Sequence, residues 1–300
     1  MPLERELAEL LGRVSKAPLI PEQRLVILRF YLIPRRLHRL VLGLWSEKLL
    51  LRLNKMIKPA MRRWLALPHD APMAYFHTEV SEGELGVPSL RTTVPGMQLR
   101  RLDKLSQSTH PACREALKTR LLKSLVQRAN AAAKYRGKEL FTKKAVSRFW
   151  TELLHHSVDG AALKNCRDAP YAQAWVIDGM RLLPGKQFID LVKLRINTFP
   201  NLTRTKRGQS DAPTGCRAGC LAPESLLHIL QACHRTHSTR LQRHDVMVAY
   251  MAERFKEVGW DVAVEPRIET DRFTVEPDLV LKREGQSVIV DALVGALGCP

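Results

Sequence analysis

The stretch CRAGCLAPESLLHILQAC, residues 216–233, contains three of the six cysteines of this 300-residue chain. Cys216, Cys220 and Cys233, together with His228, offer three sulfurs and one imidazole. This is a complete tetrahedral ligand set for structural zinc, and it leaves no position for a water molecule. Clustered cysteines in a chain with few others also favour metal binding over a disulfide scaffold. The stretch therefore predicts a structural Zn²⁺ site.

Three, seven and four residues separate the four ligands. The short loop between the first two cysteines can hold one side of the ion. His228 and Cys233 can approach from the other side on a short helical turn that begins at Pro223 and Glu224. The alternative is that His228 caps a helix while the cysteines fill apolar space. We predict a CCHC zinc finger over residues 213–238, with a role in folding and nucleic-acid docking rather than in hydrolysis.

Downstream of the finger, PDLVLKREGQSVIVD, residues 277–291, contains two apolar runs on either side of a turn at Gly285. Asp278 and Asp291 are equally distant in sequence from the Glu284–Gly285 pair. A tight turn there makes the two aspartates cross-strand partners, with Cβ atoms about 5 Å apart. The sequence therefore predicts a β-hairpin that ends in two opposed carboxylates.

Two carboxylates this close repel each other unless a divalent cation or a shared proton relieves the repulsion. Mg²⁺ is suited to such oxygen ligands and can activate a phosphodiester for hydrolysis. We therefore predict that Asp278 and Asp291 are magnesium ligands and catalytic residues. The alternative is that they are hydrogen-bonded structural aspartates. Glu265 is a third acidic candidate in the same region.

Basic residues lie between the finger and the predicted hairpin. Arg240, Arg243 and His244 are candidate nucleic-acid-binding residues, and the triplet that ends in Asp245 is expected just ahead of a helix. Asp245 is either part of this group or a helix cap.

The formal net charge of +18 favours a polyanionic partner, either nucleic acid or an anionic membrane surface. Residues 1–239 contain 40 basic and 19 acidic side chains, whereas residues 240–300 contain 8 and 11. Residues 91–148 alone contain 15 basic and 3 acidic side chains, which suits a surface that follows a phosphate backbone; the alternative is a solvated helical face. We find no long apolar run and no secretory signal, so we expect an intracellular protein without a membrane partner.

The first half of the chain has helical periodicity, with amphipathic segments near residues 4–14 and 22–42, the second interrupted by Pro34. Residues 202–216 have the composition of a linker, and the main domain boundary is expected there. After the finger, the pattern predicts one helix followed by three strands within residues 261–266, 272–281 and 287–294. The remaining cysteines, Cys113, Cys166 and Cys299, are expected to be plain thiols.

Four stretches together resemble the polyprotein of the ribosomal-DNA-specific non-LTR retrotransposons of arthropods, the R-two clade (type-1 retrotransposable elements). Residues 216–245, CRAGCLAPESLLHILQACHRTHSTRLQRHD, match the family's finger and the basic residues that follow it. The Pro-Asp at 277–278 followed by Asp291 matches its endonuclease motif. APLIPEQRLVILRFYLIPRRLHRLVLG (17–43) and MRRWLALPHDAPMAYFHTEVSEGELGVPSLR (61–91) are similar to the reverse-transcriptase thumb.

The resemblance implies a fold and a domain order. It implies a mainly α N-terminal part, with a thumb-like helical region and basic segment over residues 1–150 and a helical linker over 151–212. The CCHC finger over 213–238 follows, and residues 239–300 form the incomplete core of an α/β restriction-endonuclease-like (PD-(D/E)xK) domain.

Two departures from the family pattern limit what the chain is expected to do. No Asp-Asp pair of a polymerase palm occurs, and no lysine follows Lys282, although the family has one downstream of its second acid. The chain is therefore expected to be a C-terminal fragment, cut at both ends, that binds metal but does not necessarily cut DNA.

For the whole protein, the resemblance implies a multifunctional nuclear enzyme. Its DNA endonuclease would nick target DNA in the ribosomal RNA genes, and its RNA-directed DNA polymerase would copy element RNA from the exposed 3′-hydroxyl. The alternative is a nucleic-acid-binding zinc-finger module without nuclease activity.

Overall fold

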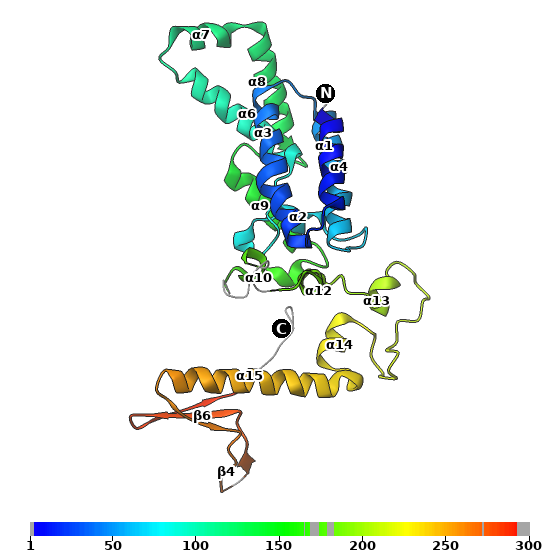
Figure 1. The fold of residues 1–300 in the computed structure, drawn as a ribbon, viewed down its shortest axis with the longest axis vertical. Helices are drawn as coiled ribbons and strands as arrows, with labels where there is room; N and C mark the ends of the chain where they lie inside the picture. Colours follow the sequence, from blue (N-terminus) through cyan, green and yellow to red (C-terminus); the bar gives the residue numbers. More distant parts are fainter. Residues whose placement is uncertain (1–2, 165, 169–173, 179–182, 272, 293–300) are drawn as a thin grey trace. The chain divides into compact units, whose positions relative to one another are not determined.

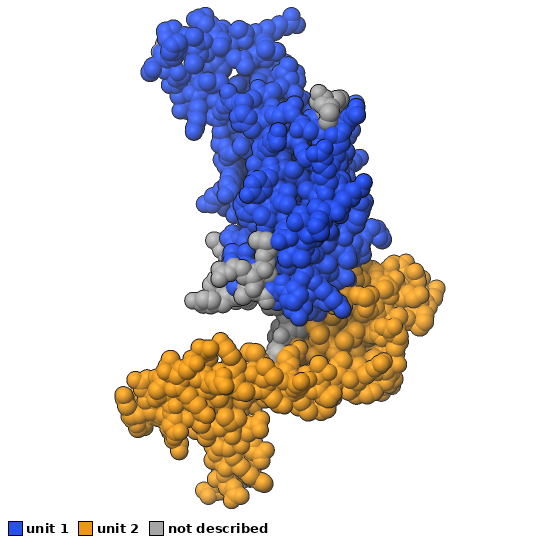
Figure 2. Space-filling model, in the orientation of Figure 1, with its two compact units in different colours: residues 1–198 blue, residues 199–300 orange. Residues whose placement is uncertain are grey.

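The computed structural model describes residues 3–164, 166–168, 174–178, 183–271 and 273–292. It divides into two compact units, Met1–Thr198 and Phe199–Pro300 (Figure 2). No helix in the described part of the chain is long and apolar enough to span a membrane. Cys299 lies outside the described residues.

The first unit is built almost entirely from helices, as predicted, and its two described strands, of two residues each, pair as one antiparallel hairpin. Its elements are α1 (Leu3–Lys16), α2 (Pro21–Ile27), η1 (Leu28–Leu32), α3 (Ile33–Leu42), α4 (Glu47–Trp64), α5 (Met73–His77), η2 (Val80–Glu82), α6 (Leu90–Ser106), α7 (Pro111–Lys118), α8 (Arg120–Ala133), β1 (Lys134–Tyr135), β2 (Lys138–Glu139), α9 (Lys143–His155), η3 (Ala161–Leu163), η4 (Cys166–Asp168), α10 (Ala174–Ile177) and α12 (Gly185–Arg195).

Apolar side chains at helical spacing produce this fold. In α4, the side chain of Ser46 caps the helix by accepting a hydrogen bond from the amide of Leu49. Leu50, Leu53 and Ile57 then recur on one face and are buried in the core of the unit. Figure 1 shows α6 and α8 side by side, with α7 joining them at one end.

The predicted helical segment 22–42 is confirmed, but its interruption has an unexpected form. Helices α2 and α3 are joined without a break by η1, which is a π-helix, and Pro34 lies in the first turn of α3. A proline has no amide hydrogen for the carbonyl four residues earlier. The wider π-helical turn just ahead of Pro34 accommodates this while the chain remains helical.

The second unit contains α13 (Leu202–Thr205), α14 (Leu226–Gln231), η6 (His234–Thr236), α15 (His237–Glu257) and five short strands. The strands are β3 (Asp261–Val264), β4 (Ile268–Glu269), β5 (Thr274–Val275), β6 (Leu279–Arg283) and β7 (Gln286–Val290). Strands β3, β6 and β7 form an antiparallel sheet in the order β3-β6-β7. Helix α15 packs along this sheet through a small core of Val248, Ala252, Leu279 and Leu281 (Figure 1).

The predicted order of one helix followed by three strands is confirmed for the sheet. The strand expected within residues 272–281 was predicted too long, since it is two elements, β5 and β6. Pro277 lies between them, and proline cannot donate to a strand ladder. Strand β5 instead pairs with β4 as a separate two-stranded ribbon.

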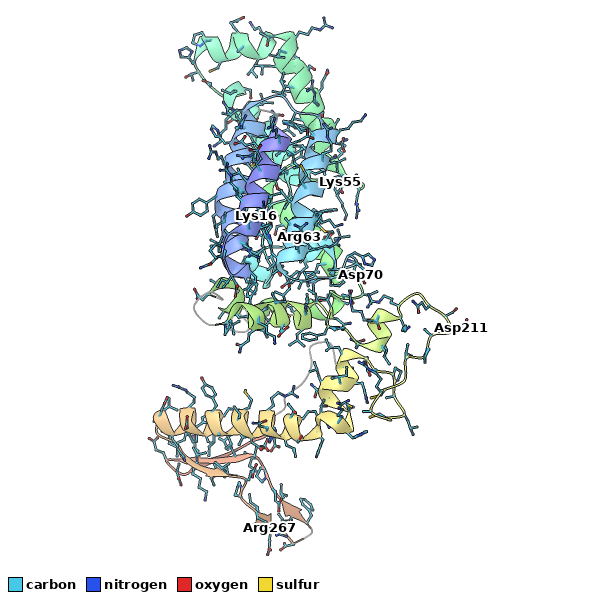
Figure 3. All side chains as sticks on the ribbon, turned by 45° about the vertical axis from the view of Figure 1, so that its right-hand side comes forward. Lys16, Lys55, Arg63, Asp70, Asp211 and Arg267 are labelled. Atoms are coloured by element: carbon cyan, nitrogen blue, oxygen red, sulfur yellow. The ribbon has the colours of Figure 1, made fainter. Side chains whose placement is uncertain are left out.

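The boundary between the two units, at Thr198, lies just ahead of the predicted linker of residues 202–216. The start of that segment is not free, because it forms α13 and contacts Glu224 through the amide of Leu202. The rest is the loop that leads into the finger, where Asp211 is labelled in Figure 3. The domain bounds expected at residues 150, 212 and 238 stay predictions.

Candidate zinc site and carboxylate row

The finger is built on a tight loop and a capped helix. Its loop closes where Cys216 donates its amide to the carbonyl of Ala222 and Gly219 adopts the left-handed conformation with φ 82°. The helix is α14, which begins at Leu226 and is capped by the side chain of Ser225. It therefore starts after the predicted Pro223 and Glu224, because a serine can cap the first turn through its hydroxyl.

The four predicted ligands lie together. The Sγ atoms of Cys216, Cys220 and Cys233 and a ring nitrogen of His228 all lie within 4.8 Å of one another. The Cys216 and Cys220 sulfurs lie 3.8 and 3.9 Å from the Cys233 sulfur. Tetrahedral zinc with Zn–S bonds of about 2.3 Å places its sulfurs about 3.8 Å apart.

Burial also fits a metal at this point. Nε2 of His228 is buried without a hydrogen-bond partner in the described structure, and such an orphaned atom is costly unless a ligand satisfies it. The amide of Ala218 donates to the sulfur of Cys216, and this hydrogen bond lowers the pKa of that thiol to about 7. The thiolate is the form that binds metal. The residues present therefore fit zinc.

An ion pair fastens the finger to α13. Arg217 donates two side-chain hydrogen bonds to Glu224, at 2.7 and 2.8 Å, in the bidentate arrangement that arginine favours with carboxylates. The hydrogen bonds from Arg217 lower the pKa of Glu224 to about 2. The same carboxylate also accepts from the amide of Leu202 in α13. Glu224 thus links α13 to the finger loop.

The predicted hairpin and its register are confirmed. Glu284 and Gly285 form a two-residue turn in which both have positive φ, 49° and 80°. This turn matches the twist of the flanking strands. Leu279 pairs with Val290, so the next pair outward is Asp278 and Asp291. The amide of Asp278 donates to Oδ1 of Asp291 at 3.3 Å.

The sheet places the backbone of a third acidic residue beside this pair. On the other side of β6, Val264 pairs with Leu279, and the amide of Glu265 donates to the carbonyl of Asp278 at 2.9 Å. Glu265, Asp278 and Asp291 therefore follow one another across the ends of the three strands. We call these three residues the carboxylate row.

Helix α15 places His244 beside the carboxylate row. Nε2 of His244 lies 3.2 Å from Oδ2 of Asp278, which also accepts a hydrogen bond from the amide of Ala292. Burial alone would lower the pKa of His244, but the hydrogen bond and charge of Asp278, followed by those of Asp245, raise it. The imidazole thus holds the Asp278 carboxylate in place.

The expectation that Arg243, His244 and Asp245 lie ahead of a helix is wrong. Helix α15 begins at His237, so Asp245 is within it and cannot cap its start. Residues 237–245, HSTRLQRHD, have little apolar periodicity, and this is why the sequence pattern placed the helix start too late.

The remaining basic candidates have separate environments. Arg240 donates to the carbonyl of Cys233, which joins the start of α15 to the finger. Nε of Arg243 is buried without a hydrogen-bond partner in the described structure. The nucleic-acid-binding roles of Arg240, Arg243 and His244 stay predictions.

The carboxylate row differs from the finger in how completely it can enclose an ion. Among the described residues, only the finger gathers ligand atoms from three or more Cys, His, Asp or Glu side chains. Asp291 is exposed, and the Asp278 side chain retains 19% of its exposure. An ion on these carboxylates would therefore share its coordination with water or with substrate oxygens, as Mg²⁺ commonly does.

Known proteins resemble this chain along almost all of its length, although no family model matches it. The Pol polyprotein of the type-2 retrotransposable element R2DM of Drosophila melanogaster is 38% identical over 284 residues, which is 95% of this chain and 27% of that protein. The Pol polyproteins of type-1 retrotransposable elements R2 of Nasonia vitripennis and Bradysia coprophila are 35% and 32% identical over 96% of this chain, and 27% and 33% of their own lengths. The chain belongs to the R2 retrotransposon Pol polyprotein family.

This membership confirms the resemblance predicted from the sequence. The chain spans about a quarter to a third of the length of these R2 relatives, which is 27% of the first two and 33% of the third. The similarity runs through both units and is not limited to the finger, because it covers at least 95% of the chain.

Proposed function

We propose that the second unit of this R2 family chain is a zinc-stabilised nucleic-acid-binding element joined to part of a magnesium-dependent DNA-nicking centre. The finger would be held by zinc on Cys216, Cys220, His228 and Cys233. Asp278 and Asp291 would hold Mg²⁺, which supplies electrophilic activation of a phosphodiester. The alignment of Asp278 and Asp291 at the end of one hairpin carries this proposal.

The contacts around the carboxylates support a site with fixed geometry. His244 and the amide of Ala292 hold one Asp278 oxygen, while the amide of Asp278 holds one Asp291 oxygen. Partners of this kind orient carboxylate ligands and are part of a metal site's design. His244 lies on the helix that follows the finger, so α15 connects the finger to the carboxylate row.

At the level of the whole R2 polyprotein, we propose a nuclear enzyme with RNA-directed DNA polymerase and site-specific DNA endonuclease activities. Its partners would be target DNA in the ribosomal RNA genes and element RNA. The nick would expose a 3′-hydroxyl from which the element RNA is copied. The names of the relatives as retrotransposon Pol polyproteins support this proposal.

One observation favours a second candidate function. The Asp278 carboxylate already has His244 and the amide of Ala292 as partners, which satisfies a purely structural aspartate. In this case the finger and the basic helices bind nucleic acid, and the hairpin only stabilises α15. This candidate is a binding module without nuclease activity.

A plasmid-nicking assay distinguishes the two functions. The chain, extended past Pro300 towards the length of its relatives, is incubated with supercoiled plasmid and Mg²⁺. We expect Asp278→Ala and Asp291→Ala each to abolish nicking. Asp261→Ala is the matched control, because Asp261 is an exposed carboxylate of the same sheet outside the carboxylate row, and it should nick normally. Undiminished nicking by both row variants would sink the nuclease assignment.

A further inference from the structure

A cavity of about 530 Å³ lies within the first unit, apart from the finger and the carboxylate row. Its walls come from η1, α5, residues 79–89 with η2, α6, the segment after β2, and α9. A volume of this size accommodates a small organic ligand. We call it the α6–α9 cavity.

Close packing of the backbone fixes one wall. A Cβ atom at Gly96 in α6 would lie 2.8 Å from the carbonyl oxygens of Leu140 and Phe141, so only glycine allows α6 to approach this segment so closely. In the same wall, the indole nitrogen of Trp150 donates to the hydroxyl of Thr92 at 3.2 Å. These two contacts hold α6 and the indole of Trp150 in place along the cavity.

One side of the cavity is aromatic and apolar. Trp150, Phe141 and Met97 line it, and the rings of His77 and Trp150 lie 4.5 Å apart. Aromatic side chains of this kind provide flat surfaces on which a nucleobase stacks, at a gain of about 1–3 kcal/mol per base.

His77 adds a hydrogen-bond acceptor to this aromatic side. Burial lowers the pKa of His77 to about 4, so the ring is neutral at neutral pH. Its Nδ1 lies 2.7 Å from the carbonyl oxygen of Val87, which can only accept, so Nδ1 carries the ring proton. Nε2 is consequently an acceptor, suited to an N–H group on the edge of a base.

Charged side chains also line the cavity. Three of them are cationic, Arg29, Arg100 and Lys143, and Glu79 supplies a carboxylate. No carboxylate pairs with Arg29 or Arg100 among the described residues, whereas Lys143 lies 3.7 Å from Glu79. Arg29 is carried by the π-helical turn η1, an irregularity that frequently marks functional sites. Helix α9 also begins at the cavity, and a helix N-terminus favours an anion.

We propose that the α6–α9 cavity binds a nucleotide, with the base on the side of Trp150 and His77 and the phosphate at Arg29 and Arg100. The site goes beyond the proposed function of the second unit, since none of its residues belongs to that unit. The nucleotide has two possible sources with the same chemistry. It is either free in solution or one residue of a single strand.

The test uses two probes. Binding of adenosine 5′-monophosphate is measured by calorimetry. Binding of an octadeoxyadenylate that carries one 2-aminopurine is measured by the fluorescence of that base. Ser147→Trp fills the cavity from α9 and should weaken binding at least about tenfold. Arg29→Ala removes a cation from the cavity lining and should weaken binding about tenfold, the effect of one charge-assisted contact. Arg148→Ala is the matched control, because Arg148 is on α9 outside the cavity, and it should change the affinity less than about twofold.

The outcomes separate the two sources. If both probes bind and both respond to Ser147→Trp and Arg29→Ala, the site accepts a free nucleotide. If only the oligonucleotide binds with this response, the nucleotide comes from a strand. The proposal would be overturned if Arg29→Ala left the affinities for both probes unchanged. It would also be overturned if Arg148→Ala weakened them as much as Arg29→Ala does. Thermal unfolding of each variant verifies that it is folded.

Discussion

Cys233 and His228 show how single side chains organise the finger. The sulfur of Cys233 is the neighbour of both other sulfurs, at 3.8 and 3.9 Å. Nε2 of His228 is buried without a partner in the described structure. Without a cation, the finger would bury a cluster of polar side chains whose hydrogen-bonding capacity is poorly satisfied. Zinc binding and folding of the finger are therefore expected to be coupled.

We predict that the purified chain contains about one zinc ion and that Cys233→Ala loses it, because three remaining ligands leave the shell open. Metal content by mass spectrometry measures this directly. Cys113→Ala is the matched control, since Cys113 lies on α7 far along the chain from the finger, and it should retain the metal. A Cys233→Ala variant with full zinc content would rule out the assigned ligand set.

At the scale of elements, the turn between β6 and β7 sets the register that places Asp278 opposite Asp291. Glu284 is a non-glycine residue at φ 49°, a conformation that asparagine tolerates better. We predict that Glu284→Asn stabilises the second unit by up to about 1 kcal/mol. Trp260 is the single tryptophan of residues 199–300 and packs against the core of this unit. Urea unfolding monitored by fluorine NMR of 5-fluorotryptophan at Trp260 measures the change.

The same substitution in a helix provides the control. Glu253 lies on the exposed side of α15, and Glu253→Asn changes the same atoms in a helical backbone. Asparagine has a lower helix propensity than glutamate, so this variant should not be more stable. Equal stabilisation by both substitutions would show that the effect is not due to the turn.

The hairpin and helix α15 differ in how much of their geometry the sequence alone predicts. The register of the hairpin could be predicted because Asp278 and Asp291 are equally distant from the Glu284–Gly285 pair, and strand pairing depends on counting residues. The contact between His244 and Asp278 could not be predicted, since it joins a helix to a strand across 34 positions. The α6–α9 cavity could not be predicted for the same reason, because its walls come from separate segments between Arg29 and Trp150.

At the scale of the whole molecule, the charge is divided unevenly along the chain. Residues 1–239 contain 40 basic side chains against 19 acidic ones, and residues 240–300 contain 8 against 11. Arg101, Lys104 and Lys123 are exposed on α6 and α8. This distribution suits a chain whose first unit and finger neutralise a phosphate backbone, while the carboxylate row remains able to hold a cation.

We predict that the affinity for single-stranded DNA falls at least about tenfold between 50 and 200 mM salt, because phosphate contacts release counterions. Replacing Arg101, Lys104 and Lys123 together by Gln should reduce the slope of log affinity against log salt by about 2. Fluorescence anisotropy measures both effects. Lys256→Gln on α15 is the control for loss of a surface cation. An unchanged slope in the triple variant would mean that these side chains form only a solvated helical face.

Calorimetric titration of Mn²⁺, as a substitute for Mg²⁺, into the zinc-loaded chain tests the carboxylate row most directly. One Mn²⁺ should bind each chain. Binding should be lost in Asp278→Asn and in Asp291→Asn but retained in Asp261→Asn, which alters a carboxylate outside the row. Binding that persists unchanged when Asp278 and Asp291 are both replaced would contradict the assignment of the carboxylate row as a metal centre.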